Sequence, residues 1–163
     1  MNRPLNPKSR RGKGLTDADF EYSRTSMALI LIVEDEIFIR QSAEWIIEDL
    51  GHQTLLAHDL DGALLHILGG QPIDAMFVDL RLGPKGLAGY GLAEEAIKHR
   101  PELRVLYTSG TRLCAEMSAQ FVAGAHFLEK PYSPDQLEAA ISLLLKPFIP
   151  APAPRQRSAP TFV

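Results

Sequence analysis

Short apolar runs alternate with helical patterns through the middle of this chain. The runs contain little polar interruption, which is typical of strands buried on both faces of a parallel sheet. They cover residues 28–33, 53–57, 73–78, 103–107 and 125–128. The segments between them repeat apolar residues every three or four positions, as amphipathic helices do. The pattern predicts one α/β domain in which five strands alternate with five helices, and helices cover both faces of the sheet.

Stop and start signals locate the first two helices. The first should end before Gly51, and its apolar stripe is Ile39, Ala43, Ile46, Ile47 and Leu50. The second should begin at Asp59, whose carboxylate can cap the free backbone N–H groups of a helix. Its predicted inner stripe is Leu60, Leu64, Ile67 and Leu68.

The remaining three helices are predicted over residues 90–99, over residues 112–123 and after Ser133. Pro101 marks the end of the first of these, because the residue before a proline avoids the helical conformation. Ser133, Pro134 and Gln136 have the spacing of a capping box with proline in the first helical turn. The helix that they open should bury Leu137, Ile141 and Leu144.

Polar residues follow four of the five apolar runs. Glu34-Asp35 follows the first run, Asp79 the third, Thr108 the fourth and Lys130 the fifth. The carboxyl ends of parallel strands meet at one edge of a sheet, where open α/β sheets bind their ligands. Three carboxylates, a hydroxyl and an ammonium group in one crevice suit Mg²⁺ beside a phosphoryl group. Asp79 is then a candidate nucleophile that forms an acyl phosphate.

Each of these residues also has an ordinary structural explanation. Glu34-Asp35 could complement the dipole at a helix N-terminus. Thr108 could reflect the preference of threonine for strands, and Lys130 could be a surface lysine held extended before Pro131. These explanations treat the residues one at a time and leave their common position after apolar runs unexplained.

Four motifs resemble the receiver domain of two-component response regulators. They are LIVEDE at residues 31–36, FVDL around Asp79, YTSG around Thr108 and FLEKPY around Lys130. The resemblance extends from Leu29 to about Leu145. It implies a flavodoxin-like, doubly wound, five-stranded parallel sheet in the order 2-1-3-4-5 with five helices. It also implies that Asp79 accepts the phosphoryl group.

The same resemblance gives roles to the other site residues. Thr108 matches the switch hydroxyl, and Lys130 matches the lysine that pairs with the phosphoryl group. Phe127 falls at the position of the switch aromatic, although it could equally be a strand residue that fills the core. The implied Mg²⁺ ligands are Glu34, Asp35, Asp79 and the backbone carbonyl of Arg81.

The function expected from the resemblance is a single-domain response regulator. A histidine kinase or a histidine phosphotransfer protein would phosphorylate Asp79, and a downstream protein target would read the altered surface. That surface should combine the helix over residues 112–123, the strand around Phe127 and the helix after Ser133. The chain would not be an enzyme beyond catalysing its own phosphorylation and dephosphorylation.

Two other functions compete with this one. The chain could be a docking module that keeps the receiver fold but works without phosphorylation. It could instead be a phosphatase with an aspartyl nucleophile. Such enzymes usually carry a second aspartate two residues after the nucleophile, where this chain has Arg81, so the phosphatase is disfavoured.

Composition and charge agree with a cytoplasmic domain. The formal net charge of −3 offers no electrostatic reason to bind nucleic acid or a membrane surface. Cys114 is the sole cysteine, so no disulfide forms within the chain. The basic residues 1–26 and the proline-rich residues 148–163 are expected to be disordered extensions of a domain at 27–147. The glycine-rich loop over residues 80–91 is longer than the resemblance leads one to expect.

Overall fold

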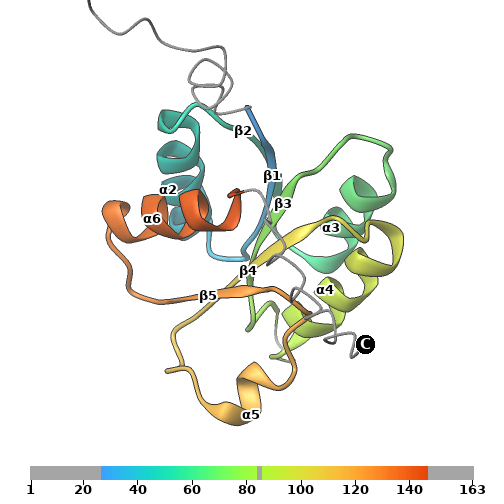
Figure 1. Cartoon of the computed structure of the whole chain (residues 1–163), viewed down its shortest axis with the longest axis vertical. Helices are drawn as coiled ribbons and strands as arrows, with labels where there is room; N and C mark the ends of the chain where they lie inside the picture. Colours follow the sequence, from blue (N-terminus) through green and yellow to red (C-terminus); the bar gives the residue numbers. More distant parts are fainter. Residues whose placement is uncertain (1–26, 84–85, 147–163) are drawn as a thin grey trace, which may run out of the picture.

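The computed structural model describes residues 27–83 and 86–146. The expected extensions at 1–26 and 148–163 lie outside the described residues. The strands are β1 (Leu29–Val33), β2 (Gln53–Ala57), β3 (Ala75–Asp79), β4 (Arg104–Ser109) and β5 (His126–Glu129). They pair in parallel in the order β2-β1-β3-β4-β5 (Figure 1). The predicted fold and strand order are therefore confirmed.

Helices cover the sheet on both faces. The helices α2 (Ile37–Asp49) and α6 (Pro134–Leu144) lie together on one side in Figure 1. The other side carries α3 (Leu60–Leu68) and α4 (Ala88–His99), and the short α5 (Ala115–Ser118) completes the set. No helix in the described ranges combines the length and apolar character that crossing a bilayer requires.

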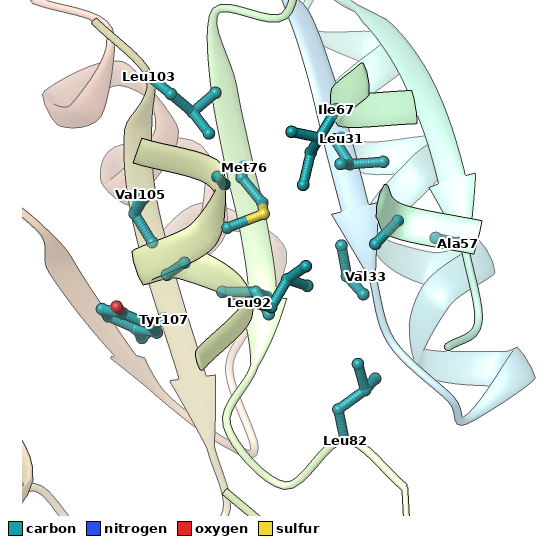
Figure 2. Close-up of a cluster of buried hydrophobic side chains, with 14 of the residues drawn as sticks. Leu31, Val33, Ala57, Ile67, Met76, Leu82, Leu92, Leu103, Val105 and Tyr107 are labelled. Atoms are coloured by element: carbon teal, nitrogen blue, oxygen red, sulfur yellow. The ribbon is translucent and has the colours of Figure 1, made fainter. Parts of the chain in front are cut away.

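Side chains of the central strands point alternately to the two faces of the sheet, so the core consists of two clusters. Leu31, Met76 and Val105 face α3 and α4, and Figure 2 shows them among the side chains between the sheet and these helices. Their neighbours Ile30, Phe77 and Leu106 face the other way and pack against α2 and α6. Successive strand residues point to opposite faces, so a strand buried on both faces must be apolar throughout.

Two predicted helix starts are present in the structure. The Asp59 carboxylate accepts a hydrogen bond from the Gly62 N–H at 2.8 Å. The Ser133 hydroxyl accepts from the Gln136 N–H at 3.2 Å, and the Gln136 side chain accepts from the Ser133 N–H at 2.8 Å. This capping box fixes the point at which the chain turns from the sheet edge into α6.

The prediction of a helix over residues 112–123 is wrong in its length, because the helix in the structure is much shorter. Regular helix is limited to Ala115–Ser118. The N–H groups of Gln120 and Phe121 then bond to carbonyls three residues back, which tightens the chain. The tightened turn brings the Phe121 ring onto Tyr107, with ring centroids 4.4 Å apart. Aromatic packing on the sheet therefore replaces further turns of this helix.

The predicted stripe of α3 is also partly wrong. Ala63 and Ile67 are its buried residues, whereas Leu60 and Leu68 are exposed at 37% and 61%. A small alanine lets α3 approach the sheet closely, and a stripe chosen from large apolar residues overlooks it.

The start of α4 lies directly against the end of β3. A Cβ atom added at Gly89 would collide with the Asp79 carbonyl oxygen and lie 2.9 Å from the Leu80 Cα. Gly89 also donates its N–H to the Leu80 carbonyl at 3.4 Å. The absence of a side chain at residue 89 therefore allows the helix to contact the backbone of Asp79.

We expect Gly89→Ala to destabilise the domain by about 1–3 kcal/mol, because neither backbone can yield without moving the core. Gly91→Ala is the matched control within α4, since a Cβ there meets nothing within 4 Å. The control should instead stabilise by about 0.5–1 kcal/mol through helix propensity. Urea denaturation measures both changes, and equal effects of the two substitutions would contradict the close contact at Gly89.

Candidate functional site

The carboxyl edge of the sheet brings Asp79 beside Thr108. Asp79 is the last residue of β3 and is 5% exposed. Thr108 is its parallel partner on β4 and is fully buried. The Leu80 N–H donates to the Thr108 carbonyl at 2.9 Å, so the strands stay paired up to this edge. The carboxylate and the hydroxyl thus come from neighbouring strands at the same level of the sheet.

Lys130 joins two of the three predicted carboxylates. Its Nζ lies 2.6 Å from Glu34 Oε2 and 3.1 Å from Asp79 Oδ2. The Glu34 side chain is fully buried, and those of Asp79 and Lys130 are 7% and 12% exposed. The Lys130 N–H also donates to the Ser109 carbonyl at 2.8 Å, which fixes its backbone to the end of β4. The ammonium therefore lies inside the crevice, and the interpretation of Lys130 as a surface lysine is wrong.

Burial and charge act in opposite directions on this pair. Burial raises the pKa of Glu34 above its usual value, and the hydrogen bond and charge of Lys130 offset this in part. Burial lowers the pKa of Lys130, but the hydrogen bond that it donates to Glu34 and the charges of Glu34 and Asp79 outweigh this effect, so the pKa is raised. Lys130 is therefore a firmly held cation.

Asp35 lies at the solvent side of the crevice. It is exposed, and its Oδ2 accepts from the Gly83 N–H at 3.2 Å in the loop that follows β3. Arg40 on α2 reaches back and donates to the Glu34 carbonyl at 2.6 Å. The sequence reasoning missed Arg40, which fixes the backbone carrying the acidic pair. An arginine in the first turns of a helix carries no signal for that role.

The donor set fits a magnesium ion. Carboxylate oxygens of Glu34, Asp35 and Asp79 all lie within 4.8 Å of one another. Two oxygens on opposite sides of a magnesium octahedron are about 4 Å apart, so a small inward movement is enough. The three carboxylates outnumber the Lys130 ammonium, so a divalent cation would offset the excess of acidic groups. Arg81 donates its N–H to Asp79 Oδ1 at 3.2 Å, and its carbonyl as a ligand stays a prediction.

Thr108 has a hydroxyl suited to a further ligand. Its Oγ1 is buried and has no hydrogen-bond partner in the described part of the chain. Most buried hydroxyls in proteins are paired, so an unpaired one beside a nucleophile candidate is informative. The hydroxyl can donate to an oxygen of a group attached to Asp79. Strand propensity alone does not account for a polar side chain at this buried position.

Phe127 belongs to an aromatic group on the face of α4. It is half-buried on β5 opposite Tyr107, and its ring centroid is 6.0 Å from that of Phe121. Phe121 stacks on Tyr107, and Tyr90 of α4 lies 5.8 Å from Tyr107. This aromatic group (Tyr90, Tyr107, Phe121 and Phe127) connects the residue before Thr108 to β5. Phe127 therefore packs against the core, and its role as a switch stays a prediction.

A cleft runs from Asp79 and Lys130 to the start of α2. Its walls include Phe38 and Ser42 of α2 and Tyr132 after β5. Phe38 is 83% exposed, which is unusual for a large aromatic side chain. Sequence reasoning did not select Phe38 or Tyr132. An apolar residue in a helix and an aromatic residue after a strand are both normally interpreted as core residues.

Comparison with known proteins gives a consistent result. The nitrogen assimilation regulatory protein NtrX of Azorhizobium caulinodans is 36% identical over 109 residues, which are 66% of this chain and 24% of that protein. This chain thus spans about a quarter of that relative. A response regulator receiver protein from Sinorhizobium medicae superposes with a TM-score of 0.65 at 26% identity, covering 73% of this chain and 94% of that one.

A second solved structure, a CheY-like receiver domain protein from Methanospirillum hungatei, gives a TM-score of 0.64 at 29% identity. It covers 72% of this chain and 93% of that one. The family model of the response regulator receiver domain matches residues 30–142, which contain all five strands except the first residue of β1, and every residue of the acidic cluster. This chain therefore belongs to the response regulator receiver domain family.

Proposed function

We propose that this chain is a phosphoacceptor switch in which Asp79 receives a phosphoryl group from a phosphohistidine on a histidine kinase or a phosphotransfer protein. The observation that carries the proposal is the environment of Asp79. The Asp79 carboxylate is buried, lies 3.1 Å from the largely buried Lys130 ammonium and belongs to a cluster suited to Mg²⁺. Its neighbour Thr108 has a buried hydroxyl that finds no hydrogen-bond partner among the described residues. We propose that the exchange takes place in the cytoplasm.

The transfer needs positioning more than acid–base chemistry. An oxygen of Asp79 attacks phosphorus, and the bond from phosphorus to the imidazole nitrogen breaks as the new P–O bond forms. The imidazole leaves with the electron pair. Lys130 can turn from Asp79 to a phosphoryl oxygen, and the Thr108 hydroxyl can donate to another. A magnesium ion bound by Glu34, Asp35 and Asp79 would supply further neutralisation of the phosphoryl charge.

The output is a change in a protein-binding surface. Movement of Thr108 toward the phosphoryl group displaces its neighbour Tyr107, whose ring stacks on Phe121. The aromatic group would then repack, and the surface around α5 and β5 would change. A downstream protein that binds one arrangement more tightly reads the signal, with a coupling free energy of about 1–3 kcal/mol.

Asp79→Asn should abolish labelling by acetyl phosphate and by a phosphohistidine donor. The amide is nearly isosteric, so the variant should keep its fold, and removal of one crowded carboxylate should not lower its melting temperature. Intact-protein mass spectrometry measures the added phosphoryl group. Undiminished labelling of the variant would show that the acceptor lies elsewhere, and absence of labelling in the parent would favour a docking module.

Mg²⁺ should stabilise the protein by about 1.4 kcal/mol at ten times its dissociation constant. Asp35→Asn keeps an oxygen that can accept from Gly83 but removes a charge, so Mg²⁺ should bind roughly tenfold more weakly. Asp61→Asn on α3 makes the same charge change outside the acidic cluster and is the control. Calorimetric titration measures the affinities, and a parent indifferent to millimolar Mg²⁺ would contradict the site.

Phe38→Ala should slow transfer from a donor protein about tenfold in kcat/KM, because an exposed aromatic side chain at the cleft is a natural anchor for the donor. Labelling by acetyl phosphate, which is too small to reach Phe38 and Asp79 together, should change less than twofold. Leu65→Ala, on α3 and 75% exposed, is the control. Equal slowing with both donors would instead assign Phe38 to the chemistry or to the fold.

A further inference from the structure

Tyr132 carries a buried polar group that the proposed transfer does not use. It lies between Lys130 and the capping residue Ser133, and its ring meets the edge of Phe77 with centroids 6.1 Å apart at 89°. The ring packs against the cluster under α2 and α6. A phenylalanine would fill this space equally well, so packing explains the ring but not the oxygen.

Tyr132 has a buried hydroxyl and forms part of the wall of the acidic crevice. The hydroxyl has almost no exposed surface and finds no hydrogen-bond partner among the described residues. Tyr132 lines the same cleft as Asp79 and Lys130. Burial raises the pKa of Tyr132, and the charges of Glu34 and Asp79 raise it further. The phenol therefore stays protonated at neutral pH and can act as a donor toward a carboxylate.

In this structure other donors occupy the carboxylate oxygens near it. Lys130 holds Glu34 Oε2 at 2.6 Å and Asp79 Oδ2 at 3.1 Å. The Glu36 N–H reaches Glu34 Oε1 at 3.3 Å. A phosphoryl group on Asp79 would attract Lys130 because it carries more charge than the carboxylate it replaces. Glu34, which is fully buried, would then lose its strongest hydrogen bond.

We infer that Tyr132 is a positioning residue whose hydroxyl donates to the Glu34 carboxylate in the phosphorylated form, in place of Lys130. This inference rests on the proposed phosphorylation of Asp79. The exchange frees Lys130 to pair with the phosphoryl group without leaving Glu34 Oε2, the oxygen that Lys130 holds in this structure, unpaired. No covalent bond forms or breaks at Tyr132. The hydroxyl is thus a reserve donor for the phosphorylated form of the site.

Tyr132→Phe tests the inference because it removes the oxygen alone. The probe is beryllofluoride, a phosphoryl analogue that binds carboxylates, titrated calorimetrically at saturating Mg²⁺. The variant should bind it about three- to tenfold more weakly than the parent, the cost of one hydrogen bond. The matched control is Tyr90→Phe, because the Tyr90 hydroxyl is also buried and unpartnered in the described residues but lies in the cluster on the other face of the sheet. The control keeps the Tyr90 ring, which makes the contacts of the aromatic group, so it should change the affinity less than twofold.

Two further measurements separate a positioning role from a packing role. Without ligand, Tyr132→Phe should unfold at the same or higher urea concentration than the parent, since the lost hydroxyl has no partner within residues 27–83 and 86–146. The affinity for Mg²⁺ alone should also stay within twofold. Beryllofluoride affinity within twofold of the parent, or equal weakening in Tyr90→Phe, would overturn the inference alone. A parent that neither binds the probe nor accepts phosphate from acetyl phosphate would overturn the proposed function as well.

Discussion

The contact of the Lys130 ammonium with Glu34 and Asp79 is the interaction on which the carboxyl edge depends. Three carboxylates crowd into one crevice, two of them almost entirely buried. Removing the partner of a buried charge typically costs about 3–5 kcal/mol. Lys130 comes from the far end of the chain segment that builds the sheet, so β1, β3 and the residues after β5 must all be in place before the charges are balanced. Folding and assembly of the site are therefore one event.

In the proposed function, this ion pair also distinguishes the two states of the molecule. In this structure the Lys130 ammonium pairs with both carboxylates. A phosphoryl group on Asp79 would carry more charge and would draw the ammonium toward itself. The movement of Lys130 is local, but β4 would transmit a movement of Thr108 to its neighbours. Thr108 and Tyr107 are consecutive on β4, so a shift of one moves the other, and Tyr107 is stacked on Phe121. In the proposed function, charge added at the crevice would thus act on the surface around α5 and β5 through the aromatic group.

Much of the fold could be predicted from sequence because its signals are local. Continuous apolar runs give buried strands, and Ser133 with Gln136 gives a helix start. The positions of Glu34, Asp79, Thr108 and Lys130 follow from a general rule about strand ends. Other features depend on contacts between distant residues. The brevity of α5 reflects the packing of Phe121 on Tyr107, and the role of Arg40 depends on where its long side chain reaches. The Tyr132 hydroxyl becomes notable once its surroundings are known.

The close approach of Gly89 to the Asp79 carbonyl has a consequence for how this family member can vary. The Asp79 backbone is held by the first turn of α4 and by the pairing of Leu80 with Thr108. The loop between β3 and α4 carries Gly83 and Leu87 with positive φ angles, and these two residues make none of the contacts just described. Its length and composition can therefore drift through insertion and deletion while Asp79 keeps its place. A chain can thus acquire new residues, and a new surface, beside this carboxylate while the carboxylate keeps its position.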